Sequence, residues 1–146
     1  MTNNKELFQA EIDNALLNFK NAKYHETINI LDNLKKKLSH FIVYWYLGHS
    51  YFRIYDYSSA INCIKKSIEL KDRDTLNLSF LAEIFLASNN YKEAIKLFKE
   101  VLKLDKTNIN SLFNLAKVYS DLGELQTAEK YYNEVIKNEH TNTEEE

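Results

Sequence analysis

The feature of this sequence that most constrains its fold is a pattern that recurs every 34 residues. Ala60, Ala94 and Ala128 are separated by that interval. Four more columns keep the same spacing, and they are Leu47, Leu81 and Leu115, then Gly48, Ala82 and Ala116, then Tyr51, Phe85 and Tyr119, and finally Ile64, Phe98 and Tyr132. Five aligned columns over three units predict a repeat architecture in which each unit packs on its neighbours.

The spacing within each unit predicts two helices. Apolar residues recur at intervals of three, four and seven, as in Leu78, Leu81 and Phe85 of one half-unit and Ala94 and Phe98 of the next. Short polar breaks (YDY, SNN and DLGE) separate the halves, and the segments KDRD and DKTN, rich in residues that cap helix N-termini, join the units. Each unit is therefore predicted to be an antiparallel helix pair, with a small residue where the two helices cross closely.

The composition supports a helical, globular chain. It has 146 residues, no proline and two glycines, so few residues interrupt long helices. Apolar residues make up 45% and charged residues 27%, which is ordinary for a globular protein and predicts one domain.

The repeat resembles the tetratricopeptide repeat (TPR) family, whose pattern runs W-x2-L-G-x2-Y, then A-x3-F, then P. Three units, 41–74, 75–108 and 109–142, carry it, and the matching residues are Tyr44, Leu47, Gly48, Tyr51, Ala60 and Ile64, then Leu78, Leu81, Ala82, Phe85, Ala94 and Phe98, then Leu112, Leu115, Ala116, Tyr119, Ala128 and Tyr132. The resemblance implies an all-α solenoid of about four antiparallel helix pairs. The family's Trp is replaced by Tyr or Leu. Its late Pro is replaced by Asp72, Lys106 and His140, which predicts looser turns or longer helices.

The two ends of the chain depart from the pattern. A first unit, 7–40, matches in its second helix but places Asn14 where Leu is expected, and the step from Thr27 to Ala60 is one residue short. We interpret it as a divergent N-terminal capping unit, although residues 6–20 could instead form one irregular helix over the first groove. Residues 139–146 are predicted to be a disordered acidic tail. The last helix would then have no following repeat to cover it. Either it is polar enough to stay exposed, or it stacks on another copy, or the chain is a piece of a longer protein.

The resemblance also implies which residues line the concave groove, because the first helix of each TPR pair faces it. Carried over to this chain, the groove residues are Ile42, Trp45, Tyr46, His49, Phe52, Arg53, Phe80, Glu83, Phe113, Asn114 and Lys117. The predicted groove is apolar and aromatic toward its N-terminal half and polar toward its C-terminal half.

An exposed aromatic patch of this kind predicts a protein–protein interaction module. The hypothesis is an adaptor whose groove binds a hydrophobic peptide or helix of a partner, with Trp45 and Phe80 as anchors and Arg53 or Lys117 meeting a carboxylate. One alternative is that these aromatic residues pack against the N-terminal helix as core. Another is a scaffold that associates with copies of itself in a larger complex.

Several partner classes are disfavoured. Members of the family that grip chaperone C-terminal carboxylates use Lys, Asn and Arg, whereas the corresponding positions here, counted from the first unit, are Ile12, Leu16, Tyr46, Leu76 and Phe80. A formal net charge of −2 gives no global attraction to nucleic acid, and the Lys35–Lys37 cluster is predicted to be a solvated helix end. No apolar run is long enough to insert in a membrane, and the N-terminus lacks the apolar core of a secretory signal.

Nothing in the sequence predicts catalysis. His25, His40, His49 and His140 show no metal-ligand spacing, and two distant glycines cannot build a phosphate-binding loop. Cys63 is the single cysteine, so no internal disulfide is possible, and we expect a reduced thiol in a cytoplasmic protein. We expect a non-enzymatic protein without metal or cofactor.

Overall fold

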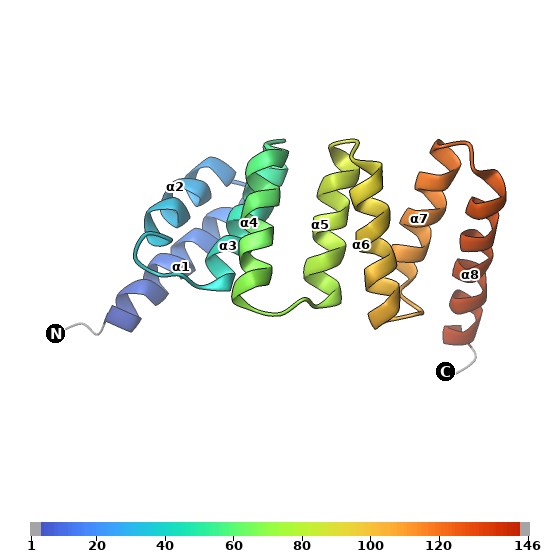
Figure 1. Cartoon of the computed structure of the whole chain (residues 1–146). Coiled ribbons are helices and arrows are strands. Elements are labelled where there is room, and N and C mark those ends of the chain that lie inside the picture. Colours follow the sequence, from blue (N-terminus) through green and yellow to red (C-terminus); the bar gives the residue numbers. More distant parts are fainter. Residues whose placement is uncertain (1–3, 144–146) are drawn as a thin grey trace. The chain divides into compact units, whose positions relative to one another are not determined.

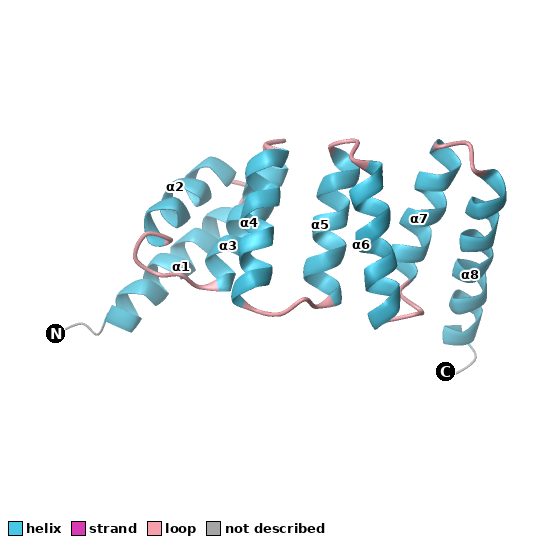
Figure 2. Ribbon diagram, in the orientation of Figure 1, coloured by secondary structure: helices cyan, strands magenta, loops and turns pink. Residues whose placement is uncertain are grey.

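The computed structural model describes residues 4–143, and within that range all regular structure is α-helical (Figure 2). The eight helices are α1 (Asn4–Lys20), α2 (Tyr24–Leu34), α3 (Phe41–Arg53), α4 (Tyr57–Leu70), α5 (Thr75–Ala87), α6 (Tyr91–Leu104), α7 (Ile109–Asp121) and α8 (Leu125–Thr143). They form the four antiparallel pairs α1–α2, α3–α4, α5–α6 and α7–α8 (Figure 1). The predicted all-α helical repeat is confirmed.

The chain divides into two compact units. The N-terminal unit, Met1–Arg73, contains α1 to α4, and the C-terminal unit, Asp74–Glu146, contains α5 to α8. The division falls at the end of the predicted 41–74 repeat. Each unit holds two helix pairs, and the interpretation of the chain as one domain stays a prediction.

The core of the N-terminal unit lies where the repeat pattern places it. Leu31, Leu34, Val43 and Leu47 are at most 1% exposed, and they come from the facing sides of α2 and α3. Gly48 allows α3 to approach α4 closely, because a Cβ at this position would lie 2.6 Å from Cγ1 of Ile64. This confirms the prediction that a small residue marks a tight crossing.

The C-terminal unit buries the equivalent columns. Leu78, Phe98, Val101, Leu115 and Val118 are fully buried between α5, α6 and α7. Because α7 covers α6, the aromatic ring of Phe98 has no exposed surface, whereas the equivalent Tyr132 on α8 is half-buried. The positions of α6 that face α5 and α7, Ala94, Phe98 and Val101, are therefore fully buried.

Each helix pair turns through a residue with positive φ. These residues are Ala22, Tyr55, Asn89 and Gly123, with φ of 58°, 66°, 61° and 78°. The left-handed region terminates a helix at low free-energy cost for glycine, and at a higher cost for residues with a Cβ. Gly123 is the one glycine among the four, and it follows the end of α7.

Side-chain caps mark the starts of α4, α5 and α7. Asp74 and Asn108, from the KDRD and DKTN segments, accept hydrogen bonds from the backbone N–H groups of Asn77 and Ser111 at 2.8 and 2.9 Å. Asp56 does the same for Ser59 at 3.1 Å. The predicted capping role of both joining segments is confirmed.

The two ends of the chain differ in part from expectation. Helix α1 pairs with α2, and it also contacts α3. That this pair is a divergent capping unit stays a prediction. The predicted disordered tail is wrong for residues 139–143, because α8 continues through His140 to Thr143. The family's proline would interrupt the helix at that column, and its absence permits the extension. Glu144–Glu146 lie outside the described residues.

Candidate functional site

The N-terminal unit contains an apolar pocket of about 380 Å³ between α1 and the start of α3. Its lining residues are Lys5, Phe8, Gln9, Ile12, Leu16, Leu38, His40 and Ile42. Five of these eight are apolar, and all five are half-buried, so part of each side chain stays accessible to solvent. A volume near 400 Å³ is within the usual range for ligand-binding pockets.

The helical period of α1 builds one wall of this pocket. Phe8, Ile12 and Leu16 are four residues apart and therefore lie along one stripe of α1. Leu38 from the α2–α3 connection and Ile42 from the first turn of α3 form the opposite wall. Most of these side chains also pack on the core of the unit, which holds the pocket in a fixed shape.

The predicted groove residues in the middle of α3 form ring contacts with one another and with α1. The Trp45 ring lies 4.3 Å from the His49 ring, and Tyr46 meets Phe19 of α1 edge-on at 5.3 Å. Phe19 also meets His49, at 6.3 Å. Burial, followed by the nearby Arg53 charge, lowers the pKa of His49 to about 4, so this imidazole is neutral at neutral pH.

The end of α3 carries the remaining two predicted residues of this unit. The Arg53 guanidinium lies over the ring of Tyr24 in α2, 5.9 Å from the ring centre, and Arg53 stays exposed. Phe52 packs against Tyr57 at the start of α4, with the ring centres 5.8 Å apart. These contacts place Phe52 and Arg53 beside the turns of the unit.

The C-terminal unit brings its predicted residues into a mostly polar row. The side-chain amide of Asn110 donates a hydrogen bond to Glu83 at 2.9 Å, which joins α7 to α5. The amide of Asn114 donates to the side-chain oxygen of Asn110 at 2.8 Å. Lys117 is exposed, and the row ends there.

The two aromatic residues predicted for the C-terminal unit differ in accessibility. Phe80 is only 8% exposed, so its ring is part of the packing of α5. Phe113 is 48% exposed and meets Tyr132 of α8 edge-on at 6.1 Å. That any of these residues contacts a partner stays a prediction.

Sequence reasoning did not include the α1 wall among the site residues. The family resemblance puts Ile12 and Leu16 at positions that bind a chaperone carboxylate in other members, and it does not mark them as a pocket wall. The signal that would have found the pocket is the four-residue spacing of Phe8, Ile12 and Leu16. The contribution of Leu38 comes from a connection, and no periodicity predicts it.

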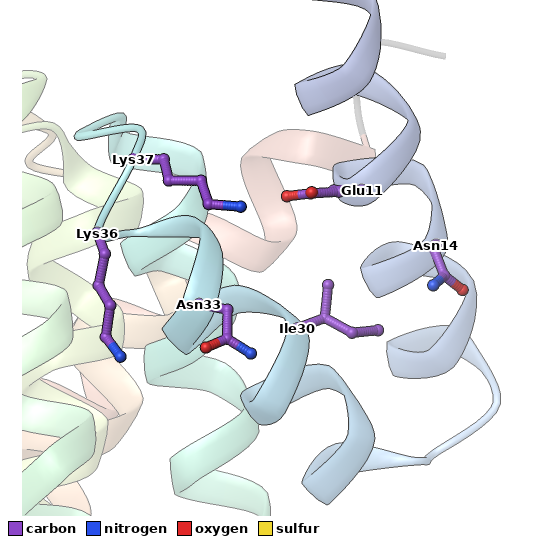
Figure 3. Close-up of a pocket in the computed structure, with 6 residues that line it drawn as sticks. All are labelled: Glu11, Asn14, Ile30, Asn33, Lys36 and Lys37. Carbon is purple, nitrogen blue, oxygen red and sulfur yellow. The ribbon is translucent and has the colours of Figure 1, made fainter. Parts of the chain in front are cut away.

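A second, polar pocket lies between α1 and α2 (Figure 3), with a volume of about 450 Å³. Glu11 and Asn14 extend from α1, Ile30 and Asn33 from α2, and Lys36 and Lys37 from the segment that follows α2. Lys36 and Lys37 are exposed. Charges of both signs at an exposed surface are well hydrated, which agrees with the predicted solvated helix end.

Residues 4–143 form neither a candidate metal centre nor a membrane-spanning helix. That range contains no cluster of three or more His, Cys, Asp or Glu side chains able to hold a metal ion. Over the same range, every helix is too short or too polar to span a bilayer.

The helix pairs, the 34-residue columns and the apolar surface together define an α-helical repeat protein. The family model described as anaphase-promoting complex, cyclosome, subunit 3 matches residues 54–135, more than half of the chain. That model describes a TPR-type repeat family, and the chain belongs to the tetratricopeptide repeat family.

Solved structures share this fold. A crystal structure of MamA superposes with a TM-score of 0.86 at 15% identity, covering 94% of this chain and 75% of that one. MamA from Desulfovibrio magneticus RS-1 gives 0.80 at 18% identity, with 95% and 77% covered. The second TPR domain of Spaghetti (RPAP3), bound to the HSP90 peptide SRMEEVD, gives 0.60 at 21%, with 71% and 96% covered. At these identities the likeness shows the fold alone. No curated protein matches the sequence.

Proposed function

We propose that this protein is a non-catalytic, cytoplasmic interaction module that binds a hydrophobic peptide or helix of a partner protein. The observation that carries the proposal is the apolar pocket between α1 and α3. The TPR fold supports a protein–protein interaction role, and one of its structural neighbours was solved with a bound peptide. Cys63, single and buried, suits a reducing compartment.

The chemistry of the pocket selects an apolar side chain. The pocket is lined by the apolar side chains of Phe8, Ile12, Leu16, Leu38 and Ile42. A Leu, Ile or Phe side chain of the partner would therefore be removed from water when it binds there. Burying one such side chain fully contributes about 2 kcal/mol to binding. The polar residues Lys5, Gln9 and His40 at the rim remain hydrated or meet the backbone of the bound segment.

The predicted groove residues take graded roles in this proposal. Trp45 and Tyr46 are half-buried aromatic residues on the same helix as Ile42, and they extend the contact surface along α3. Arg53 in the N-terminal unit and Lys117 in the C-terminal unit are exposed cations, and each by itself can meet a carboxylate of a partner. The burial of Phe80 assigns it to the support of α5 rather than to first contact.

The test compares two neighbouring leucines of α1. Leu16 lines the pocket, whereas Leu17 is 58% exposed and does not. Selection from a random peptide library is run on the wild-type chain, on Leu16→Lys and on Leu17→Lys. We expect an apolar motif to be enriched on the wild type and on Leu17→Lys, and to be lost on Leu16→Lys.

If Leu16→Lys and Leu17→Lys melt at the same temperature, the loss of peptide enrichment in Leu16→Lys does not result from unfolding. Enrichment that survives Leu16→Lys, or no apolar enrichment on the wild type, would contradict the proposal.

A self-associating scaffold is the second candidate, and the surface of α8 favours it. Leu125 and Ile136 are 67% and 52% exposed, and with half-buried Tyr132 they lie on one stripe of α8. Light scattering at two protein concentrations tests this function. A mass that grows with concentration in the wild type but not in Ile136→Lys supports a scaffold, and a constant monomer mass rejects it.

A further inference from the structure

The turn between α3 and α4 carries an exposed aromatic cluster that the pocket does not include. We call Phe52, Arg53, Tyr55 and Tyr57 the aromatic edge. Tyr55 is 78% exposed, and its ring meets Tyr57 edge-on at 6.4 Å. Tyr57 in turn packs on Phe52 at 5.8 Å. The edge is a connected surface of rings rather than scattered side chains.

The backbone at Tyr55 is unfavourable for such a residue. Its φ is 66°, in the left-handed region where a bulky side chain is rarely found. The equivalent turns of this chain use residues with small or compatible side chains, namely Ala22, Asn89 and Gly123. Tyr55 is 78% exposed and its ring touches only the edge of this cluster, so it buries little surface to offset the backbone cost, and we infer a role in binding.

The aromatic edge carries one exposed cation, Arg53, and Arg53 connects it to the α1–α2 turn, where charges of both signs lie. Arg53 lies over Tyr24, and exposed Lys20 and Lys23 flank the turn that precedes Tyr24. The acidic groups nearby are Glu26, in the first turn of α2, and Asp56, which already caps α4 by accepting from Ser59.

The two units of the chain differ in net charge. Residues 1–73 carry 11 Lys and Arg against 8 Asp and Glu, whereas residues 74–146 carry 8 against 13. The N-terminal unit therefore attracts acidic partners although the whole chain is slightly acidic.

We propose that the aromatic edge binds an acidic peptide segment of a partner protein. The Arg53 guanidinium pairs with a carboxylate through two parallel hydrogen bonds, as its planar fork favours. Tyr55, Tyr57 and Phe52 bury the apolar part of the segment with little loss of side-chain entropy. This surface shares Arg53 with the proposed function, but none of its residues lines the apolar pocket.

The test separates binding from folding, because one substitution is expected to move them in opposite directions. Tyr55→Asn places a residue that tolerates positive φ at the turn, so we expect the melting temperature to rise by about 3 °C. The probe is a short fluorescein-labelled peptide with glutamates around a central tyrosine, and its anisotropy is titrated with the full chain. We expect Tyr55→Asn and Arg53→Gln each to weaken binding about tenfold.

Two controls identify the source of the signal. The same peptide with glutamine in place of glutamate should bind far more weakly, and added salt should weaken the acidic peptide. Leu16→Lys, in the pocket, should leave this affinity unchanged, which keeps the proposal distinct from the proposed function. The proposal would be overturned if the glutamine peptide bound equally well, if Tyr55→Asn left the affinity unchanged, or if no peptide bound. It would also be overturned if labelled oligothymidine, a nucleic-acid probe, bound more tightly than the acidic peptide.

Discussion

Replacing Gly48 by Ala tests how tightly α3 and α4 pack. By sequence the change is harmless, because Ala82 and Ala116 occupy the same repeat column. The structure predicts the opposite. A Cβ on Gly48 would overlap Cδ1 of Ile64, would lie 2.6 Å from its Cγ1 and 3.4 Å from the backbone oxygen of Ala60.

The expected magnitude follows from two opposing terms. Alanine is about 1 kcal/mol more favourable than glycine inside a helix. Overpacking a core typically costs about 1–3 kcal/mol, and a 2.6 Å approach to a β-branched side chain that is itself fully buried belongs near the upper value. We therefore expect Gly48→Ala to lower the free energy of unfolding by about 2 kcal/mol.

Urea denaturation measures this difference, and Trp45 fluorescence reports on it directly because the single tryptophan lies on the same helix. A double-mutant cycle with Ile64→Ala removes the overlapping atoms. In that background the overpacking cost is removed and the helix-propensity gain of about 1 kcal/mol remains, so the two changes should be non-additive by about 3 kcal/mol. A neutral or stabilising Gly48→Ala, or simple additivity in the cycle, would refute the packing argument.

Three further predictions follow from particular side chains. Burial lowers the pKa of His49 to about 4, so between pH 4 and 6.5 the unfolded chain binds more protons than the folded one. The contribution of neutral His49 to the free energy of unfolding should be complete above pH 6.5, and up to about 3 kcal/mol of it should be lost as the pH falls toward 4. Denaturation of His49→Gln measured over the same pH range should show a flatter profile. Asp74→Ala removes the cap on Asn77 and should cost about 1 kcal/mol in denaturation, whereas Asn90→Ala, at an N-cap without a side-chain hydrogen bond to the helix, should cost less. Burial raises the pKa of the Cys63 thiol to about 11, so iodoacetamide should modify native protein slowly at pH 8 and urea-unfolded protein rapidly. Rapid modification of native protein would show that the thiol is accessible.

The helix pairs could be predicted from the sequence because their signal is local. The 34-residue columns and the three-to-four spacing identify which residues face the core, and Leu47, Leu81 and Leu115 are all at most 5% exposed. Capping is equally local, since Asp74 and Asn108 act on backbone groups three residues away. Only the C-terminal end of α8 was predicted wrongly, because acidic composition favours disorder while the preceding helix continues to propagate.

The candidate site could be predicted only in part. The repeat pattern placed Ile42 and the aromatic residues on the correct helix, but the α1 wall depends on how a divergent helix packs. The exposure of a ring is likewise decided by its neighbours: Trp45 and Phe80 were expected to act alike, yet Phe80 is 8% exposed and Trp45 is half-buried.

The sequence by itself therefore determined that this protein is a helical repeat, which helix faces are buried and where the helices begin. These properties depend on residues close together in the chain. The tertiary structure alone decided the apolar pocket, the low pKa of His49 and the strained, exposed Tyr55. Each of these results from distant side chains or from a backbone angle that residue type does not fix, because contacts between helices are set by shape and not by spacing in the sequence.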